Sequence, residues 1–203
     1  MSEEARLREA ICEHGRLLFG RGFSVGSAGN ISVRLPDCLL ITPTNSCLGR
    51  LDDQYRHVGG DPPSKEVFMH RAFLATRPEA QAVVHLHSTH ATAIACLAVP
   101  GDTAPIPPLT PYFVMRIGRT LPVIRYYRPG DPAMEPAIAE AAREARAVLL
   151  ANHGPVVSGK SLDDAVYAAE ELEEAARLAL LLEGRAARTL TLDEVGDLLR
   201  RFG

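Results

Sequence analysis

Two histidines separated by a single residue, His85 and His87, lie in the apolar stretch Ala82–Ser88. The stretch is rich in β-branched residues, which is typical of a buried strand. Side chains alternate between the faces of a strand, so both imidazoles lie on one face, about 7 Å apart, where they can bind one metal ion. The pair alone is a weak signal, because one core histidine and one exposed histidine at the strand end would give the same pattern.

A third histidine and a carboxylate complete a possible metal site. His153 follows the apolar run 147–151, a second predicted strand, and is itself followed by Gly154. Three imidazoles at strand ends leave an open coordination position on zinc, as in catalytic zinc sites. Glu66 lies in the first turn of a helix predicted over residues 64–76, with Ser64 as its N-cap. Its position suits an acid or base, although acidic residues are common in first helical turns.

Two short polar segments could bind an anion. Residues 42–46 come directly after a predicted strand, and Ser64 and Lys65 lie at a helix start. Backbone N–H groups and hydroxyls at such positions can surround a phosphate. Each segment alone also fits an ordinary loop, so the sequence leaves both interpretations open here.

The elements that must position these residues alternate along the chain. Periodicity and turn residues predict helices over residues 3–20, 64–76, 88–97, 133–146 and 161–184, and a shorter one opening at 191. Strands are predicted within residues 27–34 and over 39–42, 82–88, 121–127 and 147–151, with 110–118 ambiguous and 49–63 a surface connection. Without a repeat or linker, residues 1–203 are expected to form a single domain.

The composition excludes several classes of protein. The net charge is −3 with dispersed basic residues, which argues against a nucleic-acid partner. No apolar run reaches the length of a membrane span, and the acidic N-terminus lacks the order of a secretory signal. The four cysteines lack Cys-x-x-Cys spacing, so a zinc finger is a poor fit. We therefore expect a cytoplasmic protein that binds neither nucleic acid nor membrane.

Five motifs in order resemble the class II aldolase family, which includes fuculose-phosphate aldolases, ribulose-phosphate 4-epimerases and adducin heads. They are Ser-Ala-Gly-Asn-Ile-Ser, Thr-Pro-Thr, Pro-Ser-Lys-Glu, Val-Val-His-Leu-His-Ser and Leu-Leu-Ala-Asn-His-Gly. The resemblance spans residues 4–183. It implies an α/β fold, a three-layer α/β/α sandwich around a predominantly antiparallel central sheet.

The resemblance also implies roles for particular residues. His85, His87 and His153 match the zinc ligands, and Glu66 matches an acid/base carboxylate that can also approach the metal. Tyr126 matches a catalytic tyrosine that reaches the neighbouring subunit's site, which implies a homotetramer with sites at subunit interfaces. The positions expected to hold the substrate phosphate are Gly29, Asn30, Thr44, Asn45, Ser64 and Lys65.

Two residues differ from the pattern of the fuculose enzymes, and three sequence runs match one subgroup of the family. Asn45 replaces a glycine and Lys65 a serine of the fuculose enzymes. The runs Pro-Ser-Lys-Glu, Tyr-Tyr-Arg-Pro-Gly-Asp-Pro and Ala-Asn-His-Gly-Pro-Val-Val are most similar to the 3-oxo-tetronate 4-phosphate decarboxylases of four-carbon acid sugar catabolism. The resemblance implies zinc-dependent loss of CO₂ through a metal-stabilised enediolate, which Glu66 protonates to give dihydroxyacetone phosphate.

Some alternatives stay open at the level of sequence. Four basic residues could hold the substrate carboxylate: Lys65, Arg116, Arg125 and Arg128. A retro-aldol enzyme would use the same metal and ligands. A 4-epimerase is less well matched, because its late acid/base pair cannot be identified. An adducin-like binding module is expected to lack the three histidines and Glu66, which favours an enzyme.

Overall fold

The computed structural model describes residues 2–51, 62–99 and 104–202, and within them a single sheet of six strands lies at the centre. The strand order is β2-β1-β3-β6-β5-β4. The strands are β1 (Asn30–Arg34), β2 (Leu39–Ile41), β3 (Ala82–His85), β4 (Val123–Ile124), β5 (Ala147–Leu150) and β6 (Gly154–Gly159). All neighbouring strands are antiparallel except β4 and β5, which are parallel. The sheet is mixed, and the predicted predominance of antiparallel pairing is confirmed.

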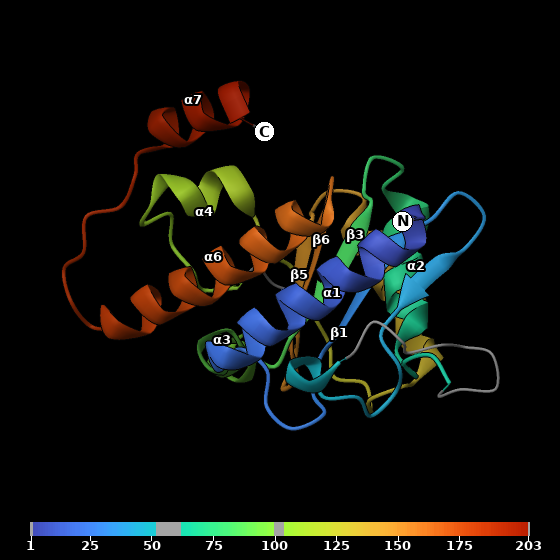
Figure 1. Ribbon diagram of the computed structural model, residues 1–203. Helices are drawn as coiled ribbons and strands as arrows, with labels where there is room; N and C mark the ends of the chain where they lie inside the picture. Colours follow the sequence, from blue (N-terminus) through green and yellow to red (C-terminus); the bar gives the residue numbers. More distant parts are fainter. Residues whose placement is uncertain (1, 52–61, 100–103, 203) are drawn as a thin grey trace.

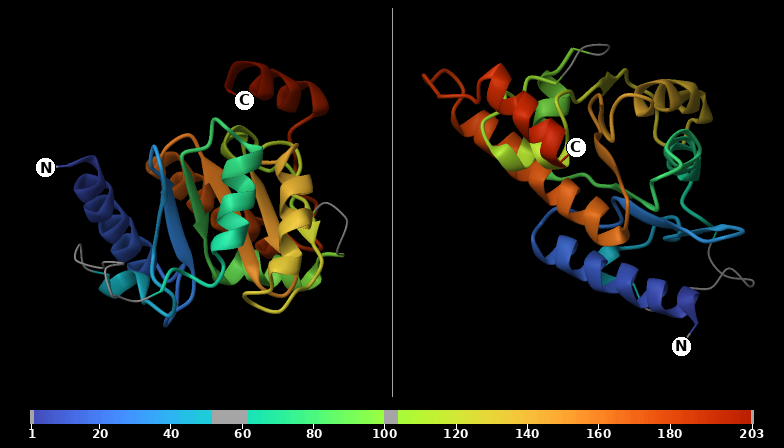
Figure 2. Two further views of the ribbon diagram at one scale, coloured as in Figure 1. Left: turned by 90° about the vertical axis from the view of Figure 1, so that its right-hand side faces the viewer. Right: turned by 90° about the horizontal axis from the view of Figure 1, so that it is seen from above.

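Helices lie against both faces of the sheet (Figures 1 and 2). In the left view of Figure 2, α2 (green) and α5 (yellow) lie in front of the strands and α6 lies behind them. Packing contacts agree, because α2 contacts α5 and β3, whereas α6 contacts β3 and β6. The helices are α1 (Glu3–Gly20), α2 (Val67–Thr76), α3 (Thr89–Leu97), α4 (Pro111–Arg116), α5 (Glu135–Ala142), α6 (Leu162–Leu181) and α7 (Leu192–Phe202), with short 3₁₀ turns η1 (Leu48–Arg50) and η2 (Pro132–Met134).

Strand β3 separates two apolar cores. Val84 and Leu86 belong to the larger core, which includes apolar residues of α1, α3 and α6. Val83 belongs to the core formed with α2 and α5. All three side chains are fully buried. The predicted alternation of faces along this strand is therefore confirmed, and His85, two residues after Val83, lies on the α2 side.

One strand was missed by the sequence prediction. β6 lies between β3 and β5, although no strand was predicted after His153. Its sequence, Gly-Pro-Val-Val-Ser-Gly, contains only two β-branched residues between residue types that are uncommon in strands. Pairing on both sides and complete burial hold it in the sheet despite this composition.

Several predicted boundaries need correction. α2 begins at Val67 with Glu66 as its N-cap, so the prediction of Ser64 as N-cap was wrong. The reason is tertiary: the Ser64 N–H donates to the Thr42 carbonyl at 3.2 Å, which keeps the chain extended up to this residue. The predicted strand 121–127 shrinks to β4, the predicted helix 133–146 to η2 and α5, and the ambiguous 110–118 contains α4. Most of the predicted connection 49–63 lies outside the described residues.

The C-terminal helix α7 packs beside α4, away from the sheet (Figure 1). Its start is fixed by a reciprocal capping box. The Thr191 N–H donates to Glu194 Oε2 at 2.7 Å, and the Glu194 N–H donates to Thr191 Oγ1 at 3.3 Å. Among the described residues, no helix has both the length and the apolar character needed to cross a bilayer.

Candidate active site

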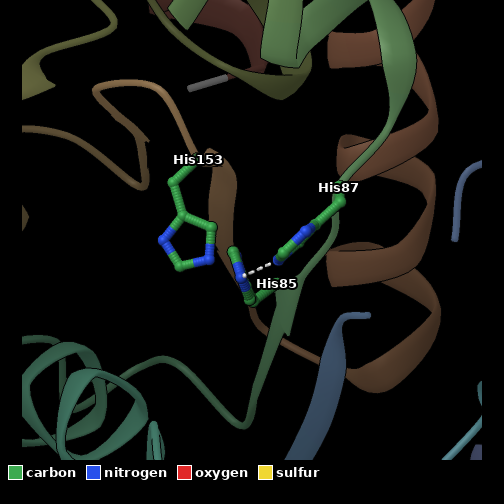
Figure 3. Close-up of side chains that lie close together, drawn as sticks. All are labelled: His85, His87 and His153. Carbon is green, nitrogen blue, oxygen red and sulfur yellow. Dashed lines mark hydrogen bonds between the residues drawn. The ribbon is translucent and has the colours of Figure 1, made fainter. Parts of the chain in front are cut away.

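The three predicted histidines meet at one end of the central strands (Figure 3). His85 is the last residue of β3, His87 follows two residues later, and His153 immediately precedes β6. Because β3 and β6 are antiparallel neighbours, the end of one strand lies beside the start of the other. Gly154 permits this approach: its φ is +151°, and a Cβ there would lie 2.3 Å from the Leu86 carbonyl oxygen.

The rings converge edge to face rather than stacking. Their centroids are separated by 4.9 Å (His85 to His87), 4.8 Å (His85 to His153) and 4.6 Å (His87 to His153). One nitrogen from each ring lies within 4.8 Å of the others, and the Nε2 atoms of His85 and His87 are 3.1 Å apart. Two nitrogens on one tetrahedral zinc are separated by about 3.3 Å. The rings are thus already close to the spacing that a shared metal ion requires.

A backbone carbonyl fixes the orientation of the His85 ring. Its Nδ1 lies 2.9 Å from the Pro155 carbonyl oxygen, which only accepts, so Nδ1 carries the proton. Nε2 therefore presents its lone pair to the other two rings. A hydrogen bond of this kind at the remote nitrogen is the usual way in which proteins orient a metal-binding histidine.

Burial keeps the imidazoles neutral. The pKa of His85 falls well below its ordinary value, chiefly through burial and then through His153 and His87. Burial, with a smaller contribution from His153, lowers the pKa of His87 to about 4. The pKa of His153 is also lowered by burial, although the Glu66 carboxylate opposes the change. Neutral imidazole is the form that binds metal, so the site is prepared to bind one at neutral pH.

A buried carboxylate anchors the helix that follows His87. Glu173 on α6 accepts hydrogen bonds from the backbone N–H groups of His90 and Ala91, both at 2.9 Å. Its Oε1 also lies 2.7 Å from Nδ1 of His90. A carboxylate at a helix N-terminus is stabilised by the helix dipole. His90 is thus occupied by Glu173 rather than by the histidine cluster, and this contact holds the start of α3 just beyond His87.

Glu66, the N-cap of α2, faces the histidine cluster. Its Oε2 is 3.6 Å from Nε2 of His85, and its Oε1 is 3.6 Å from Nε2 of His153. Oε2 also accepts a 2.9 Å hydrogen bond from the Asn30 side-chain amide. The carboxylate is buried, so Glu66 is positioned both to approach a metal ion held by the histidines and to exchange a proton with a bound molecule.

The predicted phosphate-binding residues line one pocket with the site. The pocket has a volume of about 320 Å³ and includes Glu66, His87 and His153 in its wall. The structure places all six predicted residues there: Gly29, Asn30, Thr44, Asn45, Ser64 and Lys65. Three segments that are separate in the sequence, at residues 29–30, 44–45 and 64–65, thus form a polar wall beside the histidines.

Backbone conformation explains two residues of this wall. Gly29 has a φ of +82°, and a Cβ there would lie 2.9 Å from the His85 carbonyl oxygen. Asn45 has a φ of +56°, in the left-handed region that asparagine tolerates better than other residues with a side chain. Asparagine at this position, where the resemblance led us to expect glycine, is therefore compatible with the backbone turn of this chain.

Tyr126 lies elsewhere. Its side chain is 58% exposed, and it does not line this pocket of its own chain. Exposure is compatible with a role in a neighbouring subunit, which stays a prediction.

Of the four basic residues considered for a carboxylate, Lys65 alone lines the pocket. Arg116 pairs with Asp164 at 3.8 Å, and the Arg125 guanidinium lies 4.2 Å from the centroid of the Tyr127 ring. Arg128 pairs with Asp131 at 3.4 Å. The charge of Lys65, by contrast, contributes to lowering the pKa of His153, so it acts on the site itself.

The sequence analysis missed His70 and Ser32. The predicted helix 64–76 contains His70, for which the sequence pattern indicates no role, yet this side chain is completely buried behind Asn30. Two spacings in the sequence could have indicated these two residues. Glu66 and His70 are four residues apart at the start of a helix, and Asn30 and Ser32 are two apart on a strand, so each pair shares a face.

The residues present fit a zinc ion. Three neutral imidazoles, one of them oriented by a carbonyl, are a preferred donor set for zinc in catalytic sites, with the fourth position open to a bound molecule. The buried His153 Nδ1 has no protein partner among the described residues.

Family membership agrees with this geometry. The model of the Class II Aldolase and Adducin N-terminal domain matches residues 9–180, and the chain belongs to this family. The Escherichia coli K12 protein named 3-oxo-tetronate 4-phosphate decarboxylase is 48% identical in an alignment 204 positions long that covers 96% of each chain. An L-fuculose phosphate aldolase of Haemophilus influenzae is 33% identical over 89% of this chain and 86% of its own.

A solved structure extends the similarity to the fold. YgbL from Klebsiella pneumoniae, for which aldolase, epimerase and decarboxylase activities have been suggested, superposes with a TM-score of 0.90 at 48% identity. The match covers 98% of this chain and 100% of that one. The predicted family and its α/β fold are therefore confirmed.

Proposed function

We propose that this protein is a carboxy-lyase that converts a 3-oxo-tetronate 4-phosphate into dihydroxyacetone phosphate and CO₂. The observation that carries the proposal is a pocket beside the histidine cluster in which Glu66 and the positively charged Lys65 both line the wall. The near full-length identity to proteins named for this reaction supports it. The substrate carries an anionic group at each end, which suits a pocket with one donor-rich wall and a separate ammonium group.

His85, His87 and His153 would hold the metal, which we propose to be zinc. When bound, zinc would supply Lewis-acid stabilisation of the negative charge that develops on the substrate as CO₂ leaves. The chain's own contribution is to keep the three imidazoles neutral and fixed, as burial and the Pro155 carbonyl do.

The polar wall would bind and orient the phosphate. Thr44, Asn45 and Ser64 offer hydroxyl, amide and backbone donors, and Gly29 leaves the backbone accessible. Binding at this end directs the rest of the substrate toward the histidines, and such positioning is a large part of catalytic rate enhancement. Lys65 would hold or guide the carboxylate at C1.

Glu66 would move the proton. Loss of CO₂ breaks the bond between C1 and C2 and leaves its electron pair on C2. Glu66, which takes up a proton from solvent on Oε1, delivers it to C2 directly or through water. This step completes dihydroxyacetone phosphate and leaves Glu66 ionised. Oε1 is the oxygen available for this step, since Oε2 is held by Asn30.

The assembly belongs to the same proposal. We propose that residues 1–203 form one domain, a three-layer α/β/α sandwich, and that four cytoplasmic copies form a homotetramer. Helices on both faces of one sheet support the first part. The exposed Tyr126 supports the second, because it would then complete a neighbouring site.

One assay separates this function from the related retro-aldol reaction. Zinc-loaded protein is given 3-oxo-tetronate 4-phosphate and, in a second reaction, fuculose 1-phosphate. We expect CO₂ and dihydroxyacetone phosphate from the first substrate and little lactaldehyde from the second. Release of lactaldehyde without any CO₂ would instead assign the protein as an aldolase.

A further inference from the structure

A line of hydrogen bonds runs from the core to the Glu66 carboxylate. Ser32 Oγ lies 2.7 Å from Nδ1 of His70, and Nε2 of His70 lies 2.5 Å from Oδ1 of Asn30. The Asn30 amide nitrogen then donates to Glu66 Oε2 at 2.9 Å. All four residues are buried, with Ser32 and His70 completely inaccessible to solvent.

The last bond of the line fixes the direction of all the others. Oε2 of Glu66 accepts a hydrogen bond both when the carboxylate is ionised and when its proton is on Oε1, so the Asn30 nitrogen faces Glu66 and its oxygen faces His70. His70 therefore donates from Nε2, and its Nδ1 accepts from the Ser32 hydroxyl. Every proton in the line points toward Glu66. The reverse amide orientation of Asn30 would place two acceptors 2.9 Å apart.

The two Glu66 oxygens consequently differ. Among the described residues, Asn30 provides the one side-chain hydrogen bond to the carboxylate, and it binds Oε2. Oε1 lies 3.6 Å from Nε2 of His153, and both residues line the pocket. An Asn30 amide free to rotate could turn its oxygen toward Glu66 and displace the carboxylate.

We infer that Ser32 and His70 are positioning residues: by fixing the Asn30 amide they hold Glu66 Oε2 and leave Oε1 as the oxygen that exchanges the proton. This inference rests on the proposed role of Glu66. Burial lowers the pKa of His70 to about 3, which agrees with a neutral ring throughout the working pH range. The line also assigns the Asn30 side chain a role besides the predicted phosphate binding.

The sheet offers a matched control for Ser32. Ser32 on β1 and Ser158 on β6 both pair with Val83 of β3, so they occupy one row across the sheet. Both are buried, but Ser158 Oγ donates to the Arg146 carbonyl instead of to a histidine. Ser32→Ala and Ser158→Ala thus each remove one buried hydroxyl, and only the first interrupts the line.

The test compares these variants with wild type as zinc-loaded protein. Ser32→Ala should lower kcat several-fold, and His70→Leu about 10- to 100-fold, with KM and zinc content unchanged. His70→Gln, which retains a donor, should recover part of the loss relative to His70→Leu. Ser158→Ala should lower the melting temperature as Ser32→Ala does while keeping wild-type kcat. An equal fall of kcat in both serine variants, or in neither, would overturn the inference.

A second measurement needs no catalysis. The ¹⁵N chemical shifts of histidine-labelled wild-type protein report the His70 tautomer, for which we expect a neutral ring protonated at Nε2. A ring protonated at Nδ1 would overturn the inference even if the variants lost activity. If the wild type released no CO₂, the proposed function would fail, and the tautomer would still decide whether the line exists.

Discussion

The histidine pocket and a second cavity at the opposite end of β6 differ in how their charges are paired. The second cavity is larger, about 430 Å³ against 320 Å³. Both arginines in its wall are paired: Arg77 with Glu79 at 2.8 Å, and Arg146 with Asp164 at 2.6 Å. At the smaller pocket, the Glu66 carboxylate lies 3.6 Å from a ring nitrogen of His85 and of His153, which is too long for a hydrogen bond. Volume therefore does not identify the site, whereas the convergence of three imidazole rings beside one carboxylate does.

The largest effect should come from removing a metal ligand. His87→Ala should abolish bound zinc and lower turnover by about 1,000-fold or more, because the Lewis acid is lost. Metal analysis of the purified protein and a CO₂ assay measure both. The control is Arg146→Met at the larger cavity, which should retain zinc and turnover. Stoichiometric zinc in His87→Ala would show that the ligand set is wrong.

Glu66→Gln separates proton transfer from metal binding. The amide has nearly the shape of the carboxylate but cannot deliver the proton, so turnover should fall by about 10²- to 10⁴-fold with zinc retained. The measurement combines steady-state kinetics with metal analysis. Near-normal turnover would remove Glu66 from the mechanism.

A smaller effect is expected at Lys65. Lys65→Met should lower kcat/KM about 10- to 100-fold for the substrate with two anionic ends, since one charged hydrogen bond is lost. Arg77→Met removes a cation from the larger cavity and should leave kcat/KM unchanged. Equal losses in both variants would indicate a general effect of charge rather than contact with the substrate.

The dependence of stability on pH should be the most gradual effect. The pKa of His70 is about 3 in the folded protein and 6.5 in its ordinary state, so between these values the unfolded chain binds more protons. Stability therefore falls as the pH drops below 6.5 and this contribution levels off near 3. Urea unfolding of metal-free protein at several pH values should show a shallower dependence in His70→Gln. Identical slopes in both proteins would show that His70 is not held neutral.

Much of the site could be predicted from local sequence. His85 and His87 alternate with apolar residues, so a strand places both on one side. Pro62, Pro63 and Ser64 indicate a helix start close to Glu66. The N-cap was nevertheless predicted two residues too early, at Ser64 instead of Glu66. The bond from Ser64 to the Thr42 carbonyl, between residues 22 positions apart, decides that boundary, and no local pattern contains it.

The sequence by itself determined which residue types are available for catalysis and metal binding. It also determined that His85 and Val83 lie on the same face of their strand, and it identified the family. Only the tertiary structure decided that β6 lies between β3 and β5, which brings His153 to the other two rings. It also selected Lys65 among four basic residues and connected Ser32 and His70 to Glu66. The physical reason is the range of the interactions. Periodicity and capping act within a few residues, whereas strand order and buried hydrogen bonds join segments that only the folded core brings together.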